Sequence, residues 1–175
     1  TVLGEVARRA KAALIEQNPI ARRRTDPEHI LDPGFHAEAL SFRAHNLLVS
    51  AARRFQKRTD GGMDPFTAFG EIQDHLLALA HAHVEALVHT AFTEAVERVT
   101  DPAVQAALRS MCALWGVWRL HEDIGWFLEN DVVDPRKARA IRREFGRHCA
   151  AVREHAVHLV DAFGVPDPLL GPIAF

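Results

Sequence analysis

The sequence predicts an all-α fold: an up-and-down bundle of four long helices with a short additional helix at the N-terminus. Apolar residues recur at intervals of three and four, and no segment alternates polar and apolar residues over more than a few positions. Six of the nine prolines directly follow an aspartate. Because aspartate is a favoured N-cap and proline a favoured first helical residue, each pair predicts a helix start. The pairs are Asp26-Pro27, Asp32-Pro33, Asp64-Pro65, Asp101-Pro102, Asp134-Pro135 and Asp167-Pro168.

The pattern divides the 175 residues into three segments. Residues 1–17 contain an amphipathic repeat that ends before Asn18-Pro19, and we interpret them as an N-terminal helix or the trailing helix of a preceding domain. Residues 18–34 are a polar connector, and residues 35–175 are expected to form the helical bundle. The loops between the long helices are short, which favours antiparallel packing of neighbours.

The connector carries two local signals. Thr25 and Glu28 have the spacing of a capping box over one helical turn. Arg22-Arg23-Arg24 is a basic run that we interpret as a solvated stretch, with an ion-pair contact to an acidic neighbouring surface as the sharper alternative.

The first two long helices are expected over residues 35–59 and 66–99, separated by Gly61-Gly62. Apolar residues in the second of these spread around most of the cylinder, so we expect a central helix that is contacted on several sides.

The last two long helices are expected from Pro102 to about Leu128 and from Pro135 to about Phe163, where Gly164 and Pro166 provide a stop. The third is rich in aromatic residues, and we interpret Trp115, Trp118 and Trp126 as core packing because they follow the same step as their aliphatic neighbours. The polar face of the fourth helix is expected to carry Arg136, Lys137, Arg139, Arg142, Arg143 and Arg147.

Composition excludes several classes of function. The net charge of −2 disfavours a general nucleic-acid binder, and no apolar run is long enough for a membrane span. Cys112 and Cys149 are too far apart in sequence for a CxxC pair, so we interpret both as buried thiols in a reducing compartment. No signal peptide is recognisable, and the absence of an initiator methionine suggests a processed product or part of a longer chain.

Eleven histidines call for a test of metal binding. His81, Glu85 and His89 lie four residues apart, but the outer two are about 12 Å apart along a helix and cannot share one ion. His155 and His158 lack a third ligand nearby in sequence. We therefore interpret both groups as polar helix faces and assign no metal site.

The remaining catalytic patterns are incomplete. The run His121-Glu122-Asp123 has Gly125 where a zinc protease motif needs its second histidine. No nucleophile elbow or phosphate-binding glycine loop is present, and the candidate nucleophiles lie inside predicted helices. These are Ser41, Ser50, Ser110, Cys112 and Cys149. We assign no catalytic and no cofactor-binding residue.

Four stretches of the chain are distinctive: NPIARRRTDPEHILDPGFHAEALSFR, GMDPFTAFGEIQDHLLALAHAHVE, VQAALRSMCALWGVWRLHEDIGWFLEN and HAVHLVDAFGVPDPLLGPI. Together they resemble the C-terminal helical domain of acyl-CoA oxidases, particularly bacterial ones. The resemblance runs from about Asn18 to Ile173.

The resemblance implies a parent flavoenzyme of fatty-acid β-oxidation. In that family a glutamate removes the α-proton of a fatty acyl-CoA, FAD takes hydride from the β-carbon to give trans-2-enoyl-CoA, and oxygen reoxidises the flavin to give hydrogen peroxide. The glutamate and the main FAD segments belong to upstream domains, so this chain alone is expected to be inactive and not to bind FAD. Glu71, Glu85 and Glu94 are interpreted as ordinary helix-surface carboxylates.

The expected partners are the upstream domains of the same protein and a second subunit in a homodimer, with no nucleic acid and no membrane span. The sequence ends Ile-Ala-Phe and not in a Ser-Lys-Leu-type signal, which predicts a bacterial cytoplasmic enzyme. One alternative is a free-standing module that binds a partner protein through the apolar surface of residues 66–99. A second is a histidine-based metal enzyme.

Overall fold

A computed structural model describes residues 23–166 and residue 169, and within them it is all-helical without strands, as predicted. The short helix expected within residues 1–17 and the pair Asp167-Pro168 lie outside the described residues. The helices are α2 (Pro27–Ile30), α3 (Pro33–Asp60), α4 (Pro65–Glu71), α5 (Gln73–Glu97), α6 (Pro102–Glu122), α7 (Ile124–Glu129), α8 (Pro135–Arg153) and α9 (Ala156–Asp161).

The described Asp-Pro pairs start helices as predicted. In each, the aspartate carboxylate accepts a hydrogen bond from a backbone N–H of the first turn, and proline follows at the first helical position. The N-caps are Asp26, Asp32, Asp64, Asp101 and Asp134, which begin α2, α3, α4, α6 and α8. The predicted capping box of Thr25 and Glu28 is wrong, because Asp26 is the N-cap and accepts the bond from the His29 backbone at 3.0 Å.

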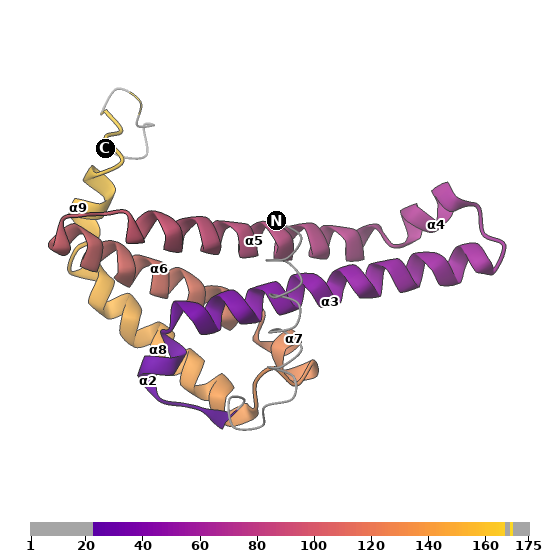
Figure 1. The fold of residues 1–175 in the computed structure, drawn as a ribbon, viewed down its shortest axis with the longest axis horizontal. Helices are drawn as coiled ribbons and strands as arrows, with labels where there is room; N and C mark the ends of the chain where they lie inside the picture. Colours follow the sequence, from indigo (N-terminus) through magenta and orange to yellow (C-terminus); the bar gives the residue numbers. More distant parts are fainter. Residues whose placement is uncertain (1–22, 167–168, 170–175) are drawn as a thin grey trace.

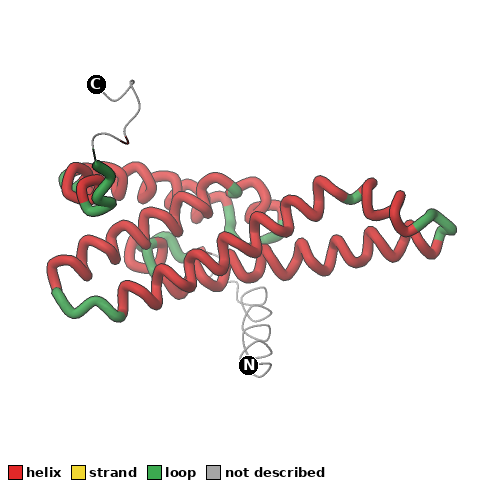
Figure 2. The backbone as a smooth tube through the Cα atoms, turned by 90° about the horizontal axis from the view of Figure 1, so that it is seen from above, coloured by secondary structure: helices red, strands yellow, loops and turns green. Residues whose placement is uncertain are grey.

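The long helices α3, α5, α6 and α8 run in alternating directions, with α8 inclined to the others (Figure 1). Helices α3 and α5 form the most extensive pair, and α6 joins both of them to α8. The far half of α3, together with α4 and the start of α5, extends past the rest of the molecule as a two-helix arm (Figures 1 and 2).

Three helix breaks were not predicted. The expected helix over 66–99 is divided at Ile72, the one from Pro102 ends at Glu122, and the one from Pro135 ends at Arg153. No proline stands at these breaks, and although Gly70 and Gly125 lie within two residues of the first two, both stand inside the described helices α4 and α7. Gly164 has a φ of 60° and follows α9, in line with the predicted stop.

The main hydrophobic core lies at one end of the molecule, where α2, α3, α6, α7 and α8 meet. Its fully buried side chains are Ile30, Val117, Leu120, Phe127 and Ile141. Helix α5 is not the central helix that its composition predicted, because its buried residues are only Ala82, His89 and Val96. Half of its apolar side chains are exposed.

Candidate functional site: the outer face of α5 and the charged layer beneath it

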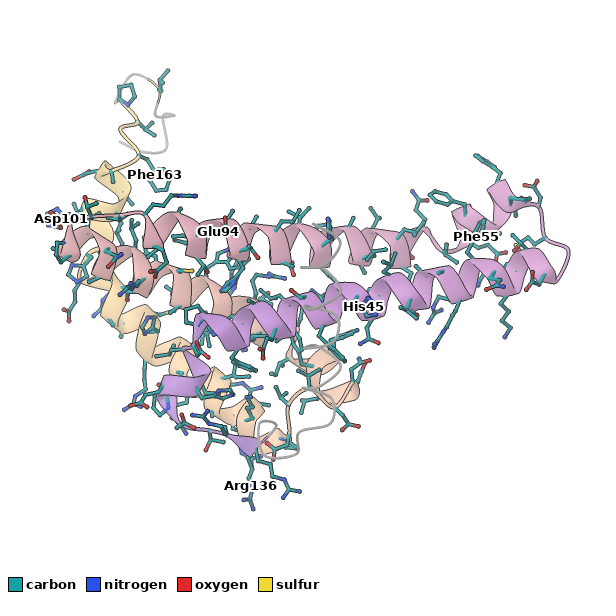
Figure 3. All side chains as sticks on the ribbon, in the orientation of Figure 1. His45, Phe55, Glu94, Asp101, Arg136 and Phe163 are labelled. Atoms are coloured by element: carbon teal, nitrogen blue, oxygen red, sulfur yellow. The ribbon has the colours of Figure 1, made fainter. Side chains whose placement is uncertain are left out.

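Helix α5 presents an apolar face to solvent. Leu77, Val84, Leu87 and Val88 are 53%, 55%, 55% and 42% exposed. They recur at helical spacing on the side opposite Ala82, His89 and Val96, and Glu94 is also exposed there (Figure 3). An apolar stripe about 16 Å long is unusual on a free-standing surface and typical of one that packs against another element. We call these four residues the α5 outer face.

The α4 segment adds two exposed aromatic side chains. Phe66 is 87% exposed and Phe69 is 56% exposed, although Phe69 belongs to the apolar pattern that predicted a central helix. Burying one such side chain stabilises a protein by about 1.5 to 3 kcal/mol, so their exposure indicates a surface with a missing neighbour.

On the inner side of α5, four charged side chains form a closed cycle. Arg43 of α3 donates to Glu85 of α5 at 3.0 Å and to Asp123, at the α6–α7 junction, at 2.8 Å. Arg119 of α6 lies 2.6 Å from the other oxygen of Glu85 and 2.9 Å from the second oxygen of Asp123. The four side chains are only 10% to 22% exposed.

The cycle is electrically neutral, and each carboxylate oxygen has a guanidinium partner. Such mutual pairing is what offsets the cost of removing charges from water. The guanidinium groups also lie over indole rings, that of Arg119 at 4.8 Å from Trp118 and that of Arg43 at 6.0 Å from Trp126. The cycle therefore holds α5 in one orientation on α3 and α6, and it determines which side of α5 faces outward.

Two buried histidines lie beside this cycle. His36 and His89 are 0% and 1% exposed, and their rings meet edge to face at 5.6 Å. The Nε2–H of His36 donates to the Ile30 carbonyl at 2.7 Å, because a carbonyl can only accept. Burial lowers the pKa of His36 to about 4 and also lowers the pKa of His89. Both rings are therefore neutral packing groups at pH 7.

Lys137 is buried and not on the polar face of its helix as predicted. Its Nζ lies 2.7 Å from His29 Nε2 and 3.7 Å from the centre of the Phe35 ring, and it is 1% exposed. Burial lowers its pKa to about 8. Burial, and then the charge of Lys137, lowers the pKa of His29 to about 4, so this histidine accepts the hydrogen bond from the ammonium group. The contact ties α2 to α8.

The histidine groups tested for metal binding are dispersed. His81 is exposed, Glu85 belongs to the charged cycle and His89 is buried against Trp115. His155 and His158 are exposed at α9. In the described part of the chain, no group of three or more histidine, cysteine, aspartate or glutamate side chains is arranged to hold a metal ion.

The sequence interpretations of the cysteines and tryptophans are partly right. Cys112 is buried, and Thr93 lies 3.6 Å from its sulfur, but Cys149 is exposed and the prediction for it is wrong. Trp126 packs against the core, whereas Trp118 is 38% exposed.

Ser110 and His148 are adjacent but are not arranged for nucleophilic catalysis. His148 Nε2 lies 3.1 Å from the Ser110 carbonyl and 3.2 Å from its hydroxyl. Because the carbonyl accepts, Nε2 carries the hydrogen and cannot take the proton of the serine. The arrangement anchors α8 to α6.

Glu85 was misread as a surface carboxylate. By contrast, Glu71 pairs with Arg58 at 2.9 Å and is half-exposed, and Glu94 is exposed, as expected for helix-surface groups. A signal was present at Arg43, which stands between Leu40 and Leu47 on the buried side of α3. A charged residue in an apolar stripe needs a buried partner of opposite charge.

Comparison with known proteins gives a consistent result. The family model described as "Acyl-CoA oxidase" matches residues 32–172. The chain belongs to the acyl-CoA oxidase family. It is 38% identical over 164 residues to a relative named acyl-coenzyme A oxidase 2, peroxisomal, from Arabidopsis thaliana, covering 92% of this chain and 23% of that protein. It is 28% identical over 144 residues to peroxisomal acyl-coenzyme A oxidase 1 of Homo sapiens, covering 82% and 22%.

Solved acyl-CoA oxidase structures share the fold. Acyl-CoA oxidase 1 of Arabidopsis thaliana superimposes with a TM-score of 0.78 at 26% identity, over 92% of this chain and 24% of that one. Acyl-CoA oxidase 3 of Yarrowia lipolytica gives 0.72 at 27% identity, over 87% and 21%. The chain thus spans about a quarter of the length of the oxidases it matches.

One expectation about this acyl-CoA oxidase chain is contradicted. Matched relatives from Arabidopsis thaliana and Homo sapiens are named as peroxisomal proteins, which conflicts with the predicted bacterial cytoplasmic enzyme. These relatives come from a plant and a mammal and give no support to the expected bacterial type. Within residues 23–166, no helix combines the length and apolar character needed to cross a membrane.

Proposed function

We propose that this chain is the C-terminal structural domain of an FAD-dependent acyl-CoA oxidase. Residues 1–17 would be the trailing helix of the preceding domain or an N-terminal helix, residues 18–34 the connector and residues 35–175 the bundle. The observation that carries the proposal is the family match over residues 32–172 in a chain that spans only about a quarter of its relatives. The parent would convert a fatty acyl-CoA to trans-2-enoyl-CoA and pass the two electrons to oxygen, giving hydrogen peroxide.

The described residues do not fit a flavin site on their own. The buried charges of Arg43, Glu85, Arg119 and Asp123 satisfy each other, and the α5 outer face is apolar and exposed. A flavin needs a shaped cleft with polar groups aimed at its ring and its diphosphate. No step of the reaction is therefore assigned to a residue of this chain.

The contribution of this chain to the parent is structural. We propose that the α5 outer face packs against the remaining domains within a homodimeric parent enzyme. Its exposed apolar side chains support this role, and the charged cycle beneath them holds α5 in place for the contact.

The test compares the parent protein with a version truncated before Pro33. The intact parent is expected to retain bound flavin and to produce hydrogen peroxide when given a fatty acyl-CoA. The truncated version should lose the flavin, form aggregates, or both. A parent that shows no acyl-CoA-dependent peroxide production contradicts the proposal.

The free-standing interaction module remains the second candidate, because the same exposed face would suit a separate partner protein. Mass spectrometry of the native protein separates the two. A native species of 19.5 kDa with no flavoprotein sequence upstream would support the module, whereas a chain several times longer supports the oxidase domain.

A further inference from the structure

The exposed side of α5 carries a regular repeat of apolar residues. Five exposed apolar residues follow one another at steps of three, four, three and four, over about 21 Å of the helix. They are Leu77, Ala80, Val84, Leu87 and Ala91, which we call the α5 seam. The buried residues Ala82, His89 and Val96 recur every seven positions on the opposite side of α5. The same seven-residue period therefore holds on both sides of this helix.

The spacing of the α5 seam is that of the a and d positions of a coiled coil, where each apolar side chain inserts between residues of a facing helix. The seam is also narrow. Exposed histidines flank it on both sides, His81 on one and His83 on the other, and Val88 widens it only locally. A stripe of this width is the surface that one helix buries against another, whereas a helix that faces a broad core presents a wider apolar face.

The helix that would fill the α5 seam is not among the described residues. Both α3 and α6 pack on the other side of α5 (Figure 1). Ala80 and Ala91 leave little side chain on the seam, so the axis of a facing helix can approach α5 to about 8 Å. The surface is therefore shaped for close packing of one further helix.

Glu94 indicates the charge of that helix. It continues the seam three residues after Ala91, is exposed, and has no cationic partner within ion-pair distance among the described residues. In a symmetric parallel pair of chains Glu94 would face Glu94, and in an antiparallel pair centred on Val84 and Leu87 it would face Leu77 at both ends. A second copy of α5 is therefore a poorer occupant than a helix with a basic residue at this point.

We propose that the α5 seam binds one α-helix from another domain of the parent enzyme, packed along α5 at a crossing angle of about 20°. The partner helix carries apolar residues at steps of three and four, with larger side chains opposite Ala80 and Ala91 and a lysine or arginine beside Glu94. The source of the helix rests on the proposed function, because the matched oxidases contain about four times the length of this chain. The helical nature of the partner rests on the seam alone.

A cysteine scan of α5 tests this geometry by alkylation rate, in the 175-residue chain and in the native parent, each with the exposed Cys149 replaced by serine. The seam variants are A80C, L87C and A91C, and the matched flanking variants are H81C and H83C, all at exposed positions. We expect all five thiols to react at similar rates in the 175-residue chain. In the parent, the seam thiols should be protected by about tenfold or more and the flanking thiols by less than about threefold.

The variant E94K tests the charge of the partner. In the parent it should speed alkylation of A91C by about threefold or more, whereas E129K, at an exposed position of α7, should leave that rate unchanged. An unchanged rate in E94K overturns the basic partner residue.

Other outcomes of the scan overturn the helix or its source. Equal protection of seam and flanking thiols in the parent would indicate a broad cover and overturn the single helix, while the proposed function stands. An absence of protection in a parent that produces peroxide likewise overturns the inference alone. Protection of the seam in the isolated chain, together with sedimentation as a dimer, would assign the seam to a second copy. The expected pattern in a parent that fails the peroxide assay would overturn the proposed function and leave the seam intact.

Discussion

The imidazole of His36 lies directly against Gly116, where a Cβ atom would collide with three atoms of the ring. This contact lies between α3 and α6, and His36 is 0% exposed. Glycine is required here for space and not for an unusual backbone angle, because Gly116 stands inside a regular helix.

The variant G116A should destabilise the chain by about 1 to 3 kcal/mol, because the histidine ring and the helix must move apart. Urea unfolding followed by circular dichroism measures this change. The control is G146A in α8, where a new Cβ meets no atom within 4 Å. That substitution should stabilise the chain by about 0.5 to 1 kcal/mol through helix propensity. Equal effects of the two variants would contradict the packing assigned to His36.

The charged cycle predicts a strong dependence on Glu85. The variant E85Q keeps the shape of the side chain but replaces one of the two carboxylates shared by Arg43 and Arg119 with a neutral amide, so Asp123 is left as the single negative charge beside two guanidinium groups. We expect a loss of about 2 to 3 kcal/mol in the free energy of unfolding. This value is near the low end of the cost of breaking a fully buried ion pair, because the side chains of the cycle retain some exposure to solvent.

The matched control for Glu85 is E94Q on the exposed side of the same helix. It should change the free energy of unfolding by less than about 0.5 kcal/mol. If E85Q is as mild as E94Q, the cycle does not hold α5 in place.

The buried histidines predict that the chain loses stability in mild acid. Burial lowers the pKa of His36 to about 4 in the folded chain, against an ordinary value of 6.5 for histidine. The unfolded chain therefore binds more protons between these values, so stability is fully present above about pH 6.5 and is lost as the pH falls toward 4. The loss from His36 is on the order of 3 kcal/mol, and His89 adds to it in the same direction.

Urea unfolding at a series of pH values between 7 and about 4.5 measures this dependence. The variant H36Q should flatten the curve, whereas H81Q, which replaces an exposed histidine, should leave its slope unchanged. An H36Q curve parallel to that of the wild type would show that His36 does not titrate with the lowered pKa.

The helix starts were predictable because the Asp-Pro signal is local: the carboxylate caps N–H groups two or three residues away. The helix breaks at Ile72 and Asp123 could not be predicted from the sequence, because they depend on tertiary packing. Asp123, for example, ends α6 with its carboxylate held by Arg43 from another helix.

The exposure of α5 could not be predicted from the sequence either. A helix that is apolar on most sides has the same pattern whether its own chain or another domain covers it. Val84 and Leu87 belong to the pattern that predicted a central helix, and both are more than half exposed. The acyl-CoA oxidases that match are about four times as long as this chain, and only this comparison indicates that other domains are available to cover α5.

Whether the rest of the enzyme covers the α5 outer face is tested most directly by the rate at which a thiol on this face reacts with an alkylating reagent. Val84→Cys is made in a Cys149→Ser background, because Cys149 is itself exposed and Cys112 is buried. We predict rapid alkylation at position 84 in the 175-residue chain and strong protection, by about tenfold or more, in the parent oxidase. Denaturing the parent should restore full labelling. Equal alkylation rates in the chain and in the native parent would contradict the claim that the rest of the enzyme covers this face.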